Sequence, residues 1–208
     1  MELVLNNISK HFGQRHVLKN INYTFIGPGL YVLFGHSGCG KTTLLNILAN
    51  LEKPSSGQLI IKNKNRFSKA GIIFQHHYLL GELTAYENVV LPLQINNCEI
   101  NKEEVNNFFA KLGVENLKHK RIKYCSGGEC QRINIIRTLL SKPAFLLADE
   151  PTGSIDETNA HFIKETLLDL AKHLLVIIVS HDRTLFANLS ATYLKLEKGS
   201  LLEYGVED

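Results

Sequence analysis

A glycine-rich segment near the start of the chain has the residues needed to bind phosphate groups. Gly35-His-Ser-Gly-Cys-Gly-Lys41-Thr42 has the spacing G-x-x-x-x-G-K-[ST], directly after an apolar run and before a helical pattern. Glycines let the backbone curl so that successive N–H groups point at phosphate oxygens, and the following helix adds its own unpaired N–H groups. Lys41 would then reach the β- and γ-phosphates, and the Thr42 hydroxyl would bind Mg²⁺. The spacing predicts a nucleoside triphosphate site, without saying what the nucleotide drives.

Two adjacent acids end a later apolar run, Phe145-Leu-Leu-Ala-Asp149-Glu150. Because side chains alternate between the faces of a strand, two neighbouring acids at its end need not do the same task. Asp149 is placed to hold Mg²⁺ through water, and Glu150 to polarise an attacking water as a general base. The alternative is a polar strand end that begins a loop at Pro151. Next to a phosphate loop, the catalytic interpretation is favoured.

A histidine follows the third strongly apolar run, in Ser180-His181-Asp182. A residue at the carboxyl end of a parallel strand lies where open α/β sheets bind their ligands. His181 would there donate a hydrogen bond to the γ-phosphate. The alternative is that it only caps the next helix beside Asp182, and His181 taken by itself favours this alternative.

The elements that must position these residues alternate between strand and helix patterns, which indicates an α/β fold. Three runs are continuously apolar (31–34, 145–148 and 174–179), as is typical of strands in the parallel centre of a sheet. The first two and last two strands fit antiparallel, half-exposed positions, and about 76–142 lacks a strand pattern, which predicts an inserted helical lobe. The predicted strands are 2–8, 17–25, 30–34, 58–62, 71–74, 145–149, 174–180, 191–197 and 201–204. The predicted helices are 41–49, 102–112, 128–141, 157–173 and 183–189.

Length and composition exclude several classes of protein. The 208 residues are 44% apolar, enough for one domain with a core, and the net charge of +3 is too small to indicate nucleic-acid binding. The longest wholly apolar run has six residues, whereas a membrane-spanning helix needs roughly 20. The N-terminus has no secretion-signal pattern, so we expect a soluble, cytosolic protein with reduced thiols at its four cysteines.

A further motif joins these features. Ser126-Gly-Gly-Glu129 is followed by Gln131-Arg132 and a helical run. Together with the phosphate loop, the strand-end acids and His181, in this order, it resembles the nucleotide-binding subunit of an ATP-binding-cassette (ABC) transporter over essentially the whole chain. The resemblance implies a P-loop NTPase core with a mainly parallel sheet, an antiparallel β subdomain and an inserted α-helical subdomain. It also implies one ATP-binding domain over 1–208, an ATPase activity, and ATP and Mg²⁺ as cofactors.

The resemblance assigns roles residue by residue. Phe12 matches the aromatic residue that stacks on adenine, with a core phenylalanine as the alternative. The catalytic residues implied are Glu150, His181 and Gln75, and the metal-binding residues are Thr42, Gln75 and Asp149. The ATP-binding residues implied are Phe12, Gly35, His36, Ser37, Gly38, Cys39, Gly40, Lys41, Thr42, Thr43, Ser126, Gly127, Gly128 and Glu129.

The implied partners are a second copy of the chain and an integral-membrane permease subunit, with no nucleic acid. Ser126 and its neighbours would contact the γ-phosphate that the other copy holds, and 153–156 would cross between the copies. The chain would lie on the inner face of the cell membrane through its membrane partner.

The segment 74–93 resembles the branch that serves lipoprotein release, macrolide and antimicrobial-peptide export, and cell division. This segment would form the groove for a helix of the membrane subunit, although its apolar residues also suit plain core packing. The alternative function is a non-transporting ATPase that signals through its membrane partner. Cys125, Cys130 and Ile155 depart from the residues usual in the family, but none of them is a phosphate, magnesium or water-activating position.

Overall fold

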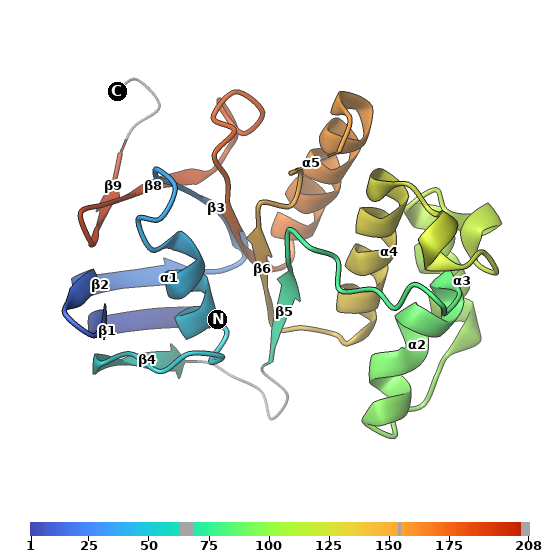
Figure 1. The fold of residues 1–208 in the computed structure, drawn as a ribbon, viewed down its shortest axis with the longest axis horizontal. Coiled ribbons are helices and arrows are strands. Elements are labelled where there is room, and N and C mark those ends of the chain that lie inside the picture. Colours follow the sequence, from blue (N-terminus) through green and yellow to red (C-terminus); the bar gives the residue numbers. More distant parts are fainter. Residues whose placement is uncertain (63–68, 154, 205–208) are drawn as a thin grey trace.

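The strands within the described part of the chain form two sheets (Figure 1). The structure is a computed structural model that describes residues 1–62, 69–153 and 155–204. The antiparallel sheet has the order β2-β1-β4, from β1 (Glu2–Phe12), β2 (Arg15–Ile26) and β4 (Ser56–Lys62). The larger sheet has the order β5-β6-β7-β3-β8-β9, with bounds β3 (Gly29–Phe34), β5 (Ala70–Ile73), β6 (Phe145–Asp149), β7 (Leu175–Val179), β8 (Thr192–Glu197) and β9 (Ser200–Glu203).

The three continuously apolar runs form adjacent strands in the middle of the larger sheet, as predicted. β6, β7 and β3 pair in parallel, and every residue of β7 is buried. Strand β8 differs from the prediction. It pairs in parallel with β3 and is antiparallel only to β9, because it returns to the sheet after a long connection instead of a hairpin turn.

Side chains of the central strands belong to two hydrophobic clusters, one on each face of the larger sheet. Val32 packs with the helices on one face, whereas Leu33 packs with α1 (Lys41–Leu48) and the antiparallel sheet on the other. This is the period-2 alternation of a strand that is buried on both sides. The carboxyl ends of β3 and β6, where the phosphate loop and the acids begin, are thereby fixed in one rigid frame.

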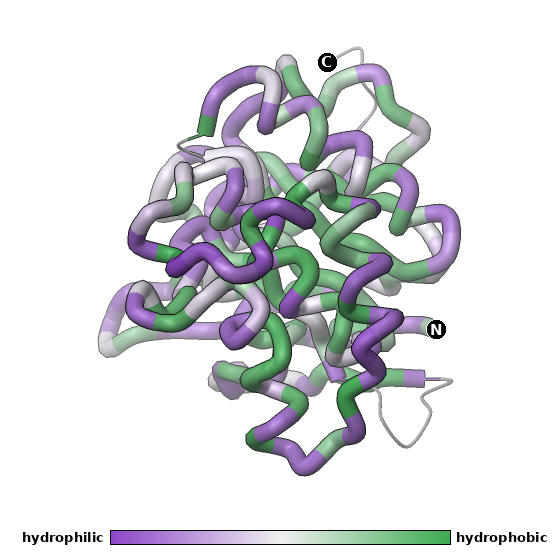
Figure 2. Tube along the Cα trace, turned by 90° about the vertical axis from the view of Figure 1, so that its right-hand side faces the viewer, coloured by the Kyte–Doolittle hydropathy of each residue, from purple (hydrophilic) through white to green (hydrophobic). Residues whose placement is uncertain are grey.

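Three α-helices lie between β5 and β6 in the chain: α2 (Ala85–Ile95), α3 (Lys102–Lys111) and α4 (Gly127–Leu140). Two short 3-10 helices, Glu115–Leu117 and Ile122–Tyr124, connect α3 to α4. Helix α2 was not among the predicted helices, although Thr84 and Glu87 form a complete capping box at its start. In α3, Val105 and Phe109 are buried four positions apart, as in an amphipathic helix. Figure 2 views this part of the chain and shows hydrophilic and hydrophobic stretches alternating along it.

The helix predicted at 183–189 is wrong. This segment forms turns, in part because the hydroxyl of Tyr193 accepts a hydrogen bond from the Leu189 N–H (2.8 Å) and donates to the Phe186 carbonyl (3.0 Å). These backbone groups are thus satisfied by a side chain rather than by helical partners. The last helix is instead α5 (Glu157–Ala171), capped by Asp156. Among the helices that the structure describes, none combines the length and apolar character needed to cross a bilayer.

Candidate ATP site

The phosphate loop connects the end of β3 to the start of α1, as predicted. Gly40 is the N-cap of α1 with φ at 110°, and Gly38 has φ at 73°, both in the region that favours glycine. A Cβ atom on Gly40 would also lie 2.7 Å from Cγ1 of Val17. The loop therefore needs glycine at this position for two reasons, its backbone angle and the packing of β2 against it.

The Lys41 ammonium bends back over this loop. It donates hydrogen bonds to the carbonyl oxygens of Gly35 (2.8 Å) and His36 (3.2 Å). The cation therefore lies above the curled backbone, next to the N-terminus of α1. Positive charge, helix dipole and loop amides together form a binding site for a triphosphate.

Thr42 of α1 and Asp149 at the end of β6 meet at this site. The Thr42 hydroxyl donates a hydrogen bond of 2.9 Å to the Asp149 carboxylate. Burial raises the pKa of Asp149, the hydrogen bond from Thr42 opposes this rise, and the charge of Glu150 adds to it. A half-buried carboxylate with a raised pKa is one that a bound cation would stabilise in its charged form.

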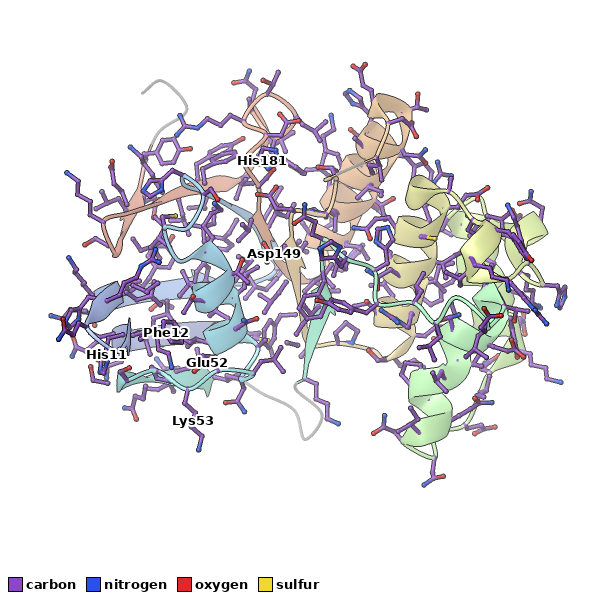
Figure 3. The ribbon with its side chains drawn as sticks, in the orientation of Figure 1. His11, Phe12, Glu52, Lys53, Asp149 and His181 are labelled. Atoms are coloured by element: carbon purple, nitrogen blue, oxygen red, sulfur yellow. The ribbon has the colours of Figure 1, made fainter. Side chains whose placement is uncertain are left out.

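Glu150 adopts a positive φ of 47°, although it is not a glycine. Its N–H donates to the Val179 carbonyl (2.9 Å), and its carboxylate accepts hydrogen bonds from the His181 backbone N–H (3.2 Å). The same oxygen lies 2.8 Å from Nδ1 of His181. Glu150 is therefore held by the last residue of β7 and by His181, two positions beyond it, at a strained backbone position typical of functional sites. Figure 3 shows Asp149 and His181 at this edge of the sheet.

These groups border one cavity of about 530 Å³, a volume usual for a small-molecule site. The predicted residues that line it are Phe12, Ser37, Gly38, Gly40, Lys41, Thr42, Thr43, Gln75, Asp149 and Glu150. Arg15 and Val17 also line it and were missed by sequence reasoning. Their positions follow from strand pairing, since Arg15 is opposite Phe12 in the β1–β2 hairpin.

Other predicted site residues are not among the described residues that line this cavity. Cys39 is buried in the core, His36 has its Nδ1 at 2.9 Å from the Ser37 carbonyl, and His181 acts on Glu150. The remaining residues in this group are Gly35, Ser126, Gly127, Gly128 and Glu129.

Ser126 is the N-cap of α4 and forms a capping box with Glu129. The Ser126 hydroxyl accepts from the Glu129 N–H (3.3 Å), and the Glu129 carboxylate accepts from the Ser126 N–H (2.7 Å). Glu129 also lies 3.4 Å from the Lys120 ammonium. The Ser-Gly-Gly motif thus forms an ordered helix start that lies outside the cavity of its own chain.

The start of α4 is joined to the segment that follows the strand-end acids. Gln131 donates to the Pro151 carbonyl (2.6 Å), and Arg132 donates to the Asn159 side chain (2.6 Å). Asn159 in turn donates to Asp156 through its backbone N–H (2.9 Å). The predicted crossing segment 153–156 lies here, with Ser154 outside the described residues.

The donor set in the cavity fits Mg²⁺ by its chemistry. Thr42, Gln75 and Asp149 offer a hydroxyl, an amide and a carboxylate oxygen, all hard donors that Mg²⁺ prefers. The described residues contain no cluster of three or more His, Cys, Asp or Glu side chains suited to a metal. A site with few protein ligands is what Mg²⁺ uses when phosphates and waters complete its coordination.

Comparison with known proteins decides the family. The family model described as ABC transporter matches residues 18–153. The chain belongs to the ABC transporter family. The lipoprotein-releasing system ATP-binding protein LolD of Rickettsia bellii (strain RML369-C) is 36% identical over 214 residues, covering 96% of this chain and 96% of that protein.

Solved structures agree over nearly the whole length. The dimeric structure of MJ0796, a bacterial ABC transporter cassette, has a TM-score of 0.85 and 29% identity, with 99% of each chain covered. A dimeric post-hydrolysis state of MJ0796, bound to ADP and Pi, has a TM-score of 0.85 and 28% identity, again over 99% of each chain. The predicted fold class is confirmed, and this chain is the ATP-binding, ATP-hydrolysing subunit of an ABC transporter.

Proposed function

We propose that the chain acts as one ATP-binding domain (1–208, with 76–142 as its helical lobe) that works in pairs. The observation that carries this proposal is the position of Ser126 at the start of α4, outside the described lining of the cavity in its own chain. Its helix start offers N–H groups and a positive dipole end to an anion. A second copy would bring this helix start to the γ-phosphate, so that two copies enclose two ATP molecules. The dimeric structure of the related MJ0796 supports this arrangement.

In this proposal, different residues bind different parts of the nucleotide. Phe12 stacks on adenine, the amides of 35–43 and the Lys41 ammonium bind the phosphates, and Ser126–Glu129 of the other copy cover the γ-phosphate. Thr42, Asp149 and Gln75 would hold Mg²⁺, which would supply positive charge against the β- and γ-phosphates.

Glu150 is the general base in this proposal. It accepts a proton from the attacking water while the water oxygen bonds to the γ-phosphorus and the bond to the bridging oxygen of ADP breaks, leaving ADP and inorganic phosphate. His181, whose Nδ1 is 2.8 Å from the Glu150 carboxylate, orients that carboxylate and contacts the γ-phosphate. Gln75 positions the water and reports the state of the site to the membrane subunit.

Mixing two inactive variants tests the paired site. Lys41→Ala removes the phosphate cation, and Ser126→Arg blocks the helix start. In a mixed pair, the intact Lys41 of one chain meets the intact Ser126 of the other, so one of the two sites is complete. ATP hydrolysis should reappear on mixing, although neither variant is active alone. If the mixture stays inactive while both variants fold and form pairs, Ser126 does not act on the neighbour's nucleotide.

Glu150→Gln tests the general base. Loss of the base should reduce turnover by about 10²- to 10⁴-fold, while ATP still brings two copies together. Sedimentation with and without ATP measures this pairing. A variant that hydrolyses ATP at the parental rate would show that another group activates the water.

The membrane subunit is proposed to dock beside the segment 74–93. A groove of about 310 Å³ there is lined by Phe74, Tyr78, Pro92 and Arg137, among others. In the same segment, the large side chains of Tyr78 and Leu80 are 66% and 51% exposed. Tyr78→Glu should release the chain from its membrane subunit in detergent-solubilised membranes without lowering ATP hydrolysis by the free chain. If Tyr78→Glu stays bound to the membrane subunit, the docking surface lies elsewhere on the chain.

The likeness to LolD over nearly all of both chains supports release of lipoproteins as the transported process. The chain would lie on the inner face of the cell membrane through its permease and would bind no nucleic acid. Release of a labelled lipoprotein from vesicles that contain the purified complex, dependent on ATP, tests the substrate class. ATP hydrolysis that releases no lipoprotein would favour the alternative, an ATPase that signals through its membrane partner.

A further inference from the structure

Lys10 lies against the aromatic ring of Phe12. The two residues are two positions apart near the end of β1, where the pairing with β2 is irregular. The Lys10 ammonium is 4.9 Å from the centroid of the Phe12 ring. Phe12 lines the cavity, whereas Lys10 is not among the described residues that line it. The ammonium therefore contacts the ring without bordering the cavity, so the part of the ring that lines the cavity stays available to a ligand.

The ammonium itself is fixed, although the ring that it contacts is not buried. Lys10 is 9% exposed, and its Nζ forms an ion pair with Glu52 and donates a hydrogen bond to the Lys53 carbonyl (2.8 Å). Figure 3 shows Phe12, Glu52 and Lys53 near one another beside the antiparallel sheet. The loop that carries Glu52 is tied to β1 by the hydrogen bond from the Ser55 N–H to the Ser9 carbonyl (2.8 Å).

Phe12 needs such a support because it is 52% exposed at the end of a strand. An exposed ring keeps rotamer freedom that a ligand must remove on binding, at a cost in affinity. A cation on one ring face attracts the π-electrons and restrains the ring, and such contacts are stronger where the cation is removed from water. The opposite face becomes less negative, which favours stacking on an electron-rich purine.

We infer that Lys10 is a positioning residue for the base of ATP, acting through Phe12. Its ammonium holds and polarises the ring, and the open face of the ring stacks on adenine. This inference rests on the proposed contact between Phe12 and the base. It also connects two parts of the site, since the loop that anchors Lys10 follows α1, the helix that begins at the phosphate-binding Lys41.

Steady-state ATP hydrolysis by Lys10→Met, Lys10→Arg and Phe12→Leu tests this role. Methionine keeps much of the length of lysine and removes its charge, so KM for ATP should rise by about 3- to 10-fold with little change in kcat. Arginine should restore KM, because a guanidinium also packs on aromatic faces. Inorganic tripolyphosphate, which has no base, should inhibit the parent and Lys10→Met with the same Ki. In the Phe12→Leu background, Lys10→Met should raise KM no further.

The matched control is Lys118→Met. The Lys118 ammonium lies 5.1 Å from the centroid of the Tyr86 ring, in the helical lobe, so its loss should leave KM for ATP unchanged. A parental KM in Lys10→Met, or an equal rise in the Ki of tripolyphosphate, would overturn the role of Lys10. If Phe12→Leu also keeps the parental KM, the proposed contact of Phe12 with the base fails too. A raised KM in Phe12→Leu with a parental KM in Lys10→Met refutes the role of Lys10 alone.

Discussion

The side-chain amide of Gln131 lies 2.6 Å from the carbonyl oxygen of Pro151. Gln131 is 1% exposed and belongs to α4, whereas Pro151 follows Glu150 directly after β6. This buried hydrogen bond joins the helix that begins with the Ser-Gly-Gly motif to the turn that carries the proposed base. Movement of either group on nucleotide binding must therefore move the other or break the bond.

Gln131→Leu should destabilise the chain. Leucine leaves the Pro151 carbonyl buried without this partner, which costs about 1–3 kcal/mol in the free energy of unfolding. Urea unfolding measures the loss. Gln94→Leu is the control, since Gln94 is exposed on α2 and its replacement should change stability by less than about 0.5 kcal/mol. Equal stability of the two variants would show that the bond contributes nothing.

Gly128→Ala should strain the same junction. A Cβ atom there would lie 2.7 Å from Oδ1 of Asn159 and closer still to its Cγ. Asn159 cannot easily move aside, because Arg132 and Asp156 both hydrogen-bond to it. Overpacking of this kind costs about 1–3 kcal/mol, and ATP hydrolysis should fall with it.

Two further variants separate this clash from a general effect of alanine. Gly81→Ala should be nearly neutral, because the new Cβ atom would be 3.7 Å from the nearest side chain. Asn159→Ala should remove the obstacle, so the double variant with Gly128→Ala should lose less stability than the sum of the two single variants. Strict additivity in urea unfolding would contradict the clash.

Asp149→Asn should stabilise the nucleotide-free chain at neutral pH. Burial raises the pKa of Asp149, so the folded state binds its proton more tightly than the unfolded state. Stability from this group is complete below the unfolded pKa and is lost as pH rises through the raised folded pKa. Asparagine does not ionise, and the stability of this variant should therefore fall less than that of the parent over this range.

Asp169→Asn should have the opposite effect and destabilise the chain at neutral pH. The hydrogen bonds from Lys111 and Lys172 lower the pKa of Asp169, so its contribution is present above the unfolded pKa and is lost as pH falls through the lowered one. Thermal unfolding at several pH values measures both effects. At neutral pH, Asp149→Asn should be more stable than the parent, and Asp169→Asn should be less stable. A loss of stability in Asp149→Asn would show that its hydrogen bond from Thr42 outweighs burial.

Tyr193→Phe should loosen the turns at 183–189. Tyr193 is 5% exposed, and its hydroxyl is a hydrogen-bond partner of the Leu189 N–H and the Phe186 carbonyl. Removing it leaves buried backbone groups unpaired, at a cost of about 1–3 kcal/mol. Hydrogen exchange of the Leu189 amide should accelerate. Tyr124→Phe, at a residue that is 65% exposed, is the control and should leave both stability and exchange unchanged.

The local sequence determined those parts of the chain whose physics is local. Apolar runs long enough for one strand produced β3, β6 and β7 where predicted, and the spacing from Gly35 to Thr42 placed a phosphate loop between a strand and a helix. Asp149 ends its strand as predicted, and Glu150 follows directly. The curl of a glycine-rich loop, the burial of an apolar strand and the start of a helix depend on residues that are neighbours in the sequence. These features can therefore be predicted before the fold is known.

Only the tertiary structure decided which distant residues meet. Arg15 and Val17 line the cavity because β2 pairs with β1. The Tyr193 hydroxyl bonds to backbone groups of a segment that was predicted to be a helix and forms turns. Lys10 is held against Phe12 by a loop some 40 residues later. Each of these contacts joins segments that carry no mark of their partner in the sequence. The contacts of Arg15, Val17 and Lys10 form where the two sheets pack around α1, and the Tyr193 contact forms in the cluster on the other face of the larger sheet. Both clusters join segments that are far apart in the sequence.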